Sequence, residues 1–297
     1  MRRRSFFNVS AGAAIGGGIL PLAQQRAATA ATATSGFAKI NGLKLYYESH
    51  GTGDALILLH GGLGATGMFD PILPVLGAGR RIIAVDLQAH GRTADVDRPL
   101  AFETMAADIS ALARHLELDQ ADILGYSMGG GVALHVAALY PHLVRKLVVV
   151  STAFRRGGWY PEIVAGMSQV GAQAAESMKQ TPMYHLYASI APRREDWPVL
   201  LTKMGALMRP DYDWSTKVRS VKAPALLAFG DADAVQPAHA VEFFRLLGGG
   251  KRDGGWDGSG ISTARLAILP GLTHYNVFSS PALAATVASF LNVNITN

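Results

Sequence analysis

Short apolar runs alternate along this chain with segments whose apolar residues recur at helical spacing. The apolar runs have the length and composition of strands buried on both faces, and they occupy residues 55–59, 81–85, 121–127, 144–150, 223–229 and 264–269. Helical spacing is found at about 102–118, from Val132 until Pro141 ends the pattern, at 237–247 and at 281–291. This alternation predicts an α/β fold in which helices flank a mostly parallel sheet.

Three segments stand outside this alternation. Residues 37–48 alternate apolar and polar side chains around Asn41-Gly42, which predicts a β-hairpin at the start of the fold. Residues 154–220 separate the fourth and fifth parallel strands and hold three of the four tryptophans and five of the nine methionines. We expect a helical insertion there, whose apolar side chains either face a substrate pocket as a lid or form the core of the insertion itself. The glycine-rich residues 248–260, which include Trp256, predict a surface loop to which we assign no function.

The first thirty residues differ from the rest in charge and composition. They contain four arginines and no acidic residue, so without them the formal charge falls from +5 to +1 and nothing favours nucleic acid as a partner. A basic start, an uncharged Ala/Gly-rich stretch from Val9 to Ala23 and small residues near Ala28 predict a secretory signal peptide. The pair Arg3-Arg4, followed by Ser-Phe-Phe, resembles a twin-arginine signal, so we expect the protein to be exported and to be periplasmic or secreted. The apolar stretch is short for a membrane span, which argues against stable membrane insertion.

The segment ADILGYSMGGG, residues 121–131, carries the strongest chemical signal. It leads from an apolar run through a glycine-flanked serine into a helical pattern, which predicts a nucleophile elbow with Ser127 as the nucleophile. We expect glycine at positions 125 and 129 because the strand and the helix must pass closely in such a turn. The backbone N–H of Met128, at the start of the helix, would face the negative charge that develops during acyl transfer and form half of an oxyanion hole.

Candidates for a base and an acid, which a nucleophilic serine requires, also follow apolar runs. In a parallel sheet such groups gather at the carboxyl ends of the strands. His274 follows the last run, whereas Asp231 and Asp233 both follow the fifth and share a face of an extended segment. His60 and His90 also follow strands, and we interpret them as candidates for lining the pocket.

Five motifs in sequence order make the chain resemble the α/β-hydrolase superfamily from about Phe37 onward. They are His60-Gly61-Gly62, Asp86 to Thr93, Gly125 to Gly129, Gly230 to Asp233 and Gly271 to His274. The resemblance implies a catalytic triad of Ser127, Asp233 and His274, with the acid third after the glycine that ends its strand. It also implies that the N–H of Gly62, with Leu63 as the alternative, completes the oxyanion hole. The second motif departs from the usual D-x-x-G-H-G-x-S pattern at Ala89 and Thr93, in a loop whose role is structural.

The resemblance also implies ester chemistry. Serine at the elbow separates this chain from relatives with aspartate there, which include epoxide hydrolases and haloalkane dehalogenases. We therefore expect a serine hydrolase that cleaves a carboxylic ester or lactone through an acyl-enzyme. The alternatives on the same fold are a cofactor-free perhydrolase, a carbon–carbon bond hydrolase and a non-catalytic binding protein, the last disfavoured because such members have typically lost a triad position.

The sequence also indicates which cofactors and partners to expect. No metal or organic cofactor is implied, and the absence of cysteine excludes a thiol nucleophile and a disulfide frame. We expect a small, partly apolar substrate, whereas the oligomeric state and the substrate's identity are not indicated. The predicted organisation is a signal peptide over residues 1–30, a hydrolase core over 31–153 and 221–297, and a helical lid over 154–220.

Overall fold

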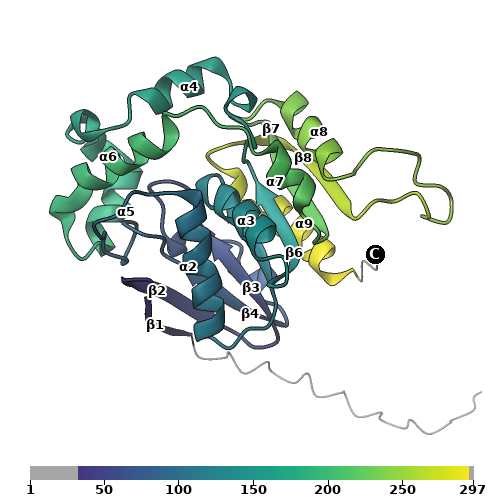
Figure 1. Cartoon of the computed structure of the whole chain (residues 1–297), viewed down its shortest axis with the longest axis horizontal. Helices are drawn as coiled ribbons and strands as arrows, with labels where there is room; N and C mark the ends of the chain where they lie inside the picture. Colours follow the sequence, from purple (N-terminus) through teal and green to yellow (C-terminus); the bar gives the residue numbers. More distant parts are fainter. Residues whose placement is uncertain (1–32, 294–297) are drawn as a thin grey trace, which may run out of the picture. The chain divides into compact units, whose positions relative to one another are not determined.

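One mixed sheet forms the centre of the fold. The computed structural model describes residues 33–293, and its strands lie side by side in the order β1-β2-β4-β3-β5-β6-β7-β8. Their bounds are β1 Thr34–Ile40, β2 Leu43–His50, β3 Asp54–Leu59, β4 Arg80–Val85, β5 Ala121–Tyr126, β6 Val144–Val150, β7 Ala225–Ala232 and β8 Ala264–Thr273. The β1–β2 hairpin turns at Asn41-Gly42 and pairs antiparallel with β4, whereas all other neighbours are parallel. The predicted fold class is confirmed (Figure 1).

Helices connect the parallel strands and cover the sheet. Their bounds are α1 Leu73–Leu76, α2 Phe102–His115, α3 Met128–Leu139, α4 Pro161–Ser168, α5 Pro182–Ile190, α6 Trp197–Met208, α7 Ser215–Ser220, α8 Pro237–Leu246 and α9 Pro281–Asn292. Proline lies in the first turn of α1, α4, α5, α6, α8 and α9. This position suits proline because its fixed φ is helical and the N–H that it lacks has no partner in the first turn.

Alternating side chains of the central strands fill two apolar layers. In β3, Leu56 and Leu58 point into the layer beneath α1 and α9, whereas Ile57 and Leu59 point into the layer beneath α2 and α3. All four side chains are fully buried. A strand with both faces covered needs apolar residues at every position, which is why these strands read as continuous apolar runs. Figure 1 shows α2 and α3 crossing one face of the sheet.

Some elements end at other residues than the sequence pattern predicted. Helix α2 ends at His115 because Glu117 turns to a φ of 56° and the Leu118 N–H reaches back to the Ala113 carbonyl. Strand β8 continues to Thr273 instead of Leu269, since Thr273 pairs with Ala232 beyond an irregular step in β7. Both ends therefore depend on backbone contacts that the spacing of apolar residues does not indicate.

Helices α4 to α7 form the insertion between β6 and β7. The fully buried Trp197 packs against Tyr184 and Tyr187 inside it. Arg155 joins the insertion to α8 through two hydrogen bonds to Glu242 of 2.6 and 2.7 Å, and Lys203 joins α6 to Asp95 at 2.6 Å. The insertion therefore has its own small core and is fastened to the sheet layers at two charged contacts.

Two sequence predictions concern segments away from this core. The predicted signal peptide lies outside the described residues. The glycine-rich loop at residues 248–260 lies at the surface, and the Trp256 side chain is fully exposed. Among residues 33–293, no helix combines the length and the apolar character that crossing a membrane requires.

Candidate active site

Ser127 lies in the sharp turn between β5 and α3. Its backbone has φ 52° and ψ −116°, a strained conformation for a residue with a side chain. The glycines on either side permit this turn: a Cβ on Gly125 would lie 2.1 Å from the Gly129 carbonyl oxygen, and one on Gly129 would lie 2.2 Å from that of Leu59. Local sterics therefore hold the Ser127 hydroxyl at the carboxyl edge of the sheet.

Three side chains from separate strand ends form a continuous chain of hydrogen bonds. The Ser127 Oγ lies 3.2 Å from the His274 Nε2, and the His274 Nδ1 lies 3.0 Å from the Asp233 Oδ1. Ser127 follows β5, Asp233 follows β7 and His274 follows β8. The Nδ1 contact with a carboxylate places a proton on Nδ1 and leaves Nε2 free to accept the serine proton.

The Asp233 carboxylate accepts hydrogen bonds at both oxygens. Oδ1 also accepts from the Val235 N–H at 3.1 Å, while Oδ2 accepts from the Gly230 N–H at 3.2 Å and from the Ser151 hydroxyl. Burial alone would raise the pKa of Asp233, but the His274 contact and the Ser151 hydrogen bond outweigh it and lower the pKa below its usual 3.8. The carboxylate is thus held ionised and fixed in orientation although its side chain is buried.

Asp231 points to a different partner. Its Oδ1 accepts a hydrogen bond of 2.8 Å from the Gly271 N–H, so it fastens the exposed turn that precedes His274. Tyr126 supports the same turn because its hydroxyl donates to the His274 carbonyl at 2.6 Å. Sequence reasoning missed Ser151 and Tyr126, although Ser151 follows the apolar run of β6 and so met the strand-end criterion used for the other residues.

The loop after β3 brings Gly62 and Leu63 to the same pocket as Ser127 and Met128. Leu63 has a φ of 61°, which is uncommon for a residue with a side chain. Met204 of the insertion lies against the loop, since a Cβ on Gly62 would come within 2.6 Å of its terminal methyl carbon. Residues of this loop and of the first turn of α3 therefore border the cavity in which the serine hydroxyl lies.

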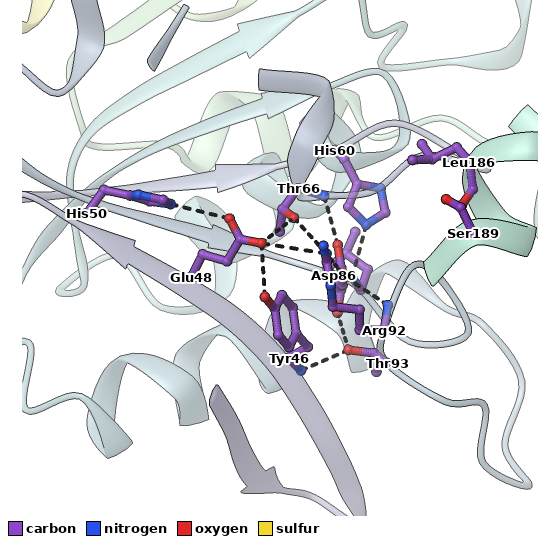
Figure 2. Close-up of polar contacts among 11 residues, drawn as sticks. Tyr46, Glu48, His50, His60, Thr66, Asp86, Arg92, Thr93, Leu186 and Ser189 are labelled. Atoms are coloured by element: carbon purple, nitrogen blue, oxygen red, sulfur yellow. Dashed lines mark hydrogen bonds and ion pairs between the residues drawn. The ribbon is translucent and has the colours of Figure 1, made fainter. Parts of the chain in front are cut away.

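A polar network anchored on Asp86 holds this loop (Figure 2). The buried Asp86 carboxylate accepts from the Thr66 N–H at 2.7 Å and from the Arg92 N–H at 2.8 Å. Thr93, where the usual motif has serine, still supplies a hydroxyl: it donates to the Asp86 carbonyl at 2.6 Å and accepts from the Tyr46 N–H at 2.9 Å. Ala89 has a φ of 64° where the usual motif has glycine. The loop keeps its structural role at both departures.

His60 and His90 do not line the pocket beside Ser127, so that expectation is wrong. Both rings are fully buried, with their centres 5.1 Å apart. His60 Nε2 accepts from the Leu87 N–H at 3.0 Å and Nδ1 bonds the Gly61 carbonyl at 2.7 Å. Burial lowers the pKa of His60 to about 4 and that of His90 to about 3, so both rings are neutral. The Leu87 contact of His60 joins the loop after β3 to the loop after β4.

An apolar pocket of about 170 Å³ opens beside Ser127. Its walls come from the segments that follow β3, β5 and β6, from the start of α2 and from the insertion, and consist of Gly62, Leu63, Phe102, Ser127, Met128, Thr152, Ala153, Trp159, Met167, Met204, Leu207, Met208, Tyr212 and Trp214. Two of the three tryptophans and three of the five methionines of the insertion face this pocket. Among residues 33–293, no group of three or more His, Cys, Asp or Glu side chains is arranged to hold a metal ion.

Known proteins share this architecture. A family model described as alpha/beta hydrolase fold matches residues 54–249. Serine hydrolase BPHL of Mus musculus is 28% identical over 231 residues, covering 75% of this chain and 79% of the relative. The enol-lactonase of Burkholderia xenovorans LB400 superposes with a TM-score of 0.66 at 21% identity, covering 86% of this chain and 100% of that one. A thermophilic esterase of Thermogutta terrifontis gives 0.67 at 21% identity, covering 88% and 98%. At these identities the two structural matches establish the fold alone.

Proposed function

Since this chain belongs to the alpha/beta hydrolase fold family, we propose that it is a serine hydrolase that cleaves carboxylic esters or lactones through an acyl-enzyme. The observation that carries the proposal is the unbroken set of contacts from the Ser127 hydroxyl through the His274 imidazole to the buried Asp233 carboxylate. A nucleophile, a base and an orienting acid within hydrogen-bond reach of one another are what acyl transfer to serine requires.

In the proposed reaction, the Ser127 Oγ attacks the carbonyl carbon while the His274 Nε2 takes the hydroxyl proton. The resulting oxyanion accepts hydrogen bonds from the Met128 N–H and from the N–H of Gly62, with Leu63 as the alternative donor. The bond to the leaving oxygen then breaks, and His274 returns the proton to that oxygen, so the alcohol departs and the acyl-enzyme remains. Water repeats the same steps and releases the acid, and Asp233 stabilises the imidazolium in both halves.

Relatives support the ester and lactone class. The names of the proteins that resemble this chain include a serine hydrolase, an esterase and an enol-lactonase. Serine at the elbow supports the same class, because an acyl-enzyme on serine is hydrolysed by water activated at the same histidine.

We extend the proposal to the insertion and to the N-terminus. The insertion acts as a lid, in support of which Trp159, Met167 and Trp214 line the pocket beside the nucleophile. The protein is exported by a twin-arginine signal, in support of which stands the Arg3-Arg4-Ser-Phe-Phe sequence of a segment outside the described residues.

The test is the loss of the nucleophile without loss of the fold. Ser127→Ala is expected to lower kcat for p-nitrophenyl esters by at least about 10⁴, because the elbow is held by backbone and glycines and only the attacking oxygen is lost. A fluorophosphonate probe is expected to label the wild type at Ser127 and to leave Ser127→Ala unlabelled. Ser189→Ala is the matched control, since that exposed hydroxyl donates to the Leu186 carbonyl at 2.7 Å and does not line the pocket (Figure 2). Activity of Ser127→Ala within tenfold of the wild type would refute the mechanism.

A further inference from the structure

The apolar pocket borders the nucleophile directly. Ser127 is part of its wall, whereas the His274 ring is not and packs against the wall residue Trp159, with 5.5 Å between the ring centres. In ester cleavage the leaving oxygen must lie within reach of the His274 Nε2, since that nitrogen returns the proton. The leaving group therefore lies next to His274, and the pocket, whose wall includes Ser127 and the proposed oxyanion donors Gly62 and Met128, receives the acyl group.

The walls of this pocket carry no formal charge. Its lining residues are aliphatic, aromatic or sulfur-containing, apart from the hydroxyl groups of Ser127, Thr152 and Tyr212. Arg156, which lies behind the wall, turns its guanidinium to the Met208 carbonyl and to the Ser168 hydroxyl. A carboxylate on the acyl group would thus lose its water without gaining a counter-charge, which is strongly unfavourable.

Three polar side chains of the wall, those of Thr152, Trp159 and Tyr212, are already bonded within the protein. The Thr152 hydroxyl donates to the Ser127 carbonyl at 2.8 Å. The Trp159 indole N–H donates to the Tyr212 hydroxyl at 2.7 Å, and that hydroxyl contacts the Ala153 carbonyl at 3.3 Å. Burial raises the pKa of Tyr212 to about 12, so it remains a neutral phenol. The Trp214 indole is likewise an uncharged donor, which leaves hydrocarbon as the group that these walls match best.

The volume of the pocket sets an upper limit on the size of the acyl group. A volume of about 170 Å³ is comparable to the roughly 150 Å³ of an apolar cavity that accommodates one benzene molecule. The bulky side chains of Phe102, Trp214, Met204 and Met208 border this space. A phenyl ring or a chain of about six carbons fills it, whereas a fatty acyl chain of twelve or more carbons exceeds it.

We propose that the pocket bordered by Phe102, Met208 and Trp214 binds a compact, uncharged hydrocarbon acyl group and rejects acyl groups that end in a carboxylate. This selectivity rests on the serine hydrolase function proposed above and names the substrate class for it.

The experiment compares p-nitrophenyl esters with the full chain. From acetate to hexanoate, kcat/KM is expected to rise about fourfold per methylene as apolar surface is buried, and then to fall at least tenfold by dodecanoate. Mono-p-nitrophenyl adipate, which has the length of hexanoate and a terminal carboxylate, is expected to react at least about 100-fold more slowly than hexanoate because the charge finds no partner. Its methyl ester, which is longer but neutral, separates charge from length and is expected to stay within tenfold of hexanoate.

Variants of the wall test whether this pocket sets the preference. Met208→Ala removes a side chain from the wall and is expected to move the optimum two or three carbons toward longer chains. Met183→Ala is the matched control, because Met183 also belongs to the insertion but is exposed and does not line the pocket. Fluorophosphonate labelling of Ser127 in each variant shows that the fold is intact.

The outcomes separate the two proposals. If Ser127 is labelled but the adipate half-ester reacts within tenfold of hexanoate, or if activity is flat up to dodecanoate, the acyl-group assignment is overturned and the serine hydrolase remains. An unchanged optimum in Met208→Ala would also overturn it. If no ester is cleaved and Ser127 is not labelled, the proposed function falls and the acyl-group assignment falls with it.

Discussion

Replacing Asp233 with asparagine exchanges one carboxylate oxygen for an NH₂ group and so tests the proposed role of Asp233 as the triad acid. The two Asp233 oxygens accept from four donors: the His274 Nδ1–H, the Val235 N–H, the Gly230 N–H and the Ser151 hydroxyl. An asparagine places an NH₂ group on one side of this set. If the NH₂ faces His274, the imidazole must carry its proton on Nε2 and cannot accept one from serine. If it faces Gly230, two N–H groups oppose each other in a buried site.

The expected loss of activity follows from the charge that is removed. The Nδ1–Oδ1 distance is 3.0 Å. With charge centres about 4 Å apart and an effective dielectric constant of about 20, an imidazolium and a carboxylate attract by about 4 kcal/mol. Losing this attraction in the transition state lowers kcat about 10³-fold, and the wrong tautomer extends the loss toward about 10⁴-fold, as in the serine-protease template. KM is expected to change little, because the acid does not line the pocket.

Asp231→Asn is the matched control, two residues away on the same loop. Asparagine keeps an oxygen that accepts the Gly271 N–H, so kcat is expected to stay within threefold of the wild type, with the effect confined to a modest loss of thermal stability. The assay is turnover of p-nitrophenyl hexanoate together with the melting temperature of each variant. A dead Asp231→Asn beside an active Asp233→Asn would refute the acid assignment and leave the roles of Ser127 and His274 standing.

Three further predictions concern the fold, its pH dependence and export. Gly129→Ala is expected to lower the free energy of unfolding by about 3 kcal/mol or more, because its Cβ would lie 2.2 Å from a backbone carbonyl of β3; a change below about 0.5 kcal/mol in urea unfolding would contradict the elbow sterics. Burial lowers the pKa of His60 and of the buried His239 in α8 from 6.5 to about 4. Between these pH values the unfolded chain binds more protons, so stability falls as the pH falls. The slope is at most about 1.4 kcal/mol per pH unit for each histidine, and equal urea midpoints at pH 7 and pH 5 would contradict it. Replacing Arg3 and Arg4 with lysine is expected to leave precursor in the cytoplasm on cell fractionation, whereas normal amounts of mature periplasmic protein would refute the twin-arginine route.

Local sterics and burial made much of the site predictable from sequence. A strand covered on both faces must be apolar throughout, and a serine in a strained turn needs glycines beside it. Neighbouring residues were therefore enough to predict β3, β5 and the Ser127 elbow. The choice between Asp231 and Asp233 could not be predicted from neighbouring residues, because two residues on one extended face have the same local pattern. The family resemblance favoured Asp233, and the structure places it rather than Asp231 beside His274.

Contacts between distant segments account for what the sequence did not reveal. Ser151 reaches Asp233 because β6 and β7 are neighbours in the sheet, although 82 residues separate the two positions. The neutral state of His60 and His90 likewise depends on their complete burial. Which of the insertion's tryptophans and methionines face the pocket depends on how the insertion is fastened to the sheet. Side-chain period gives no information on that arrangement.

The placement of the tryptophans gives the protein a built-in optical probe. Trp159, Trp197 and Trp214 are at most 9% exposed, whereas Trp256 is fully exposed on its loop. Trp159 and Trp214 border the pocket, and Trp197 lies inside the insertion. Acrylamide can therefore quench the emission of Trp256, and that emission does not respond to binding in the pocket. Changing it to phenylalanine would leave a spectrum in which two of three fluorophores touch whatever enters beside Ser127, so binding could be followed without a chromogenic ester.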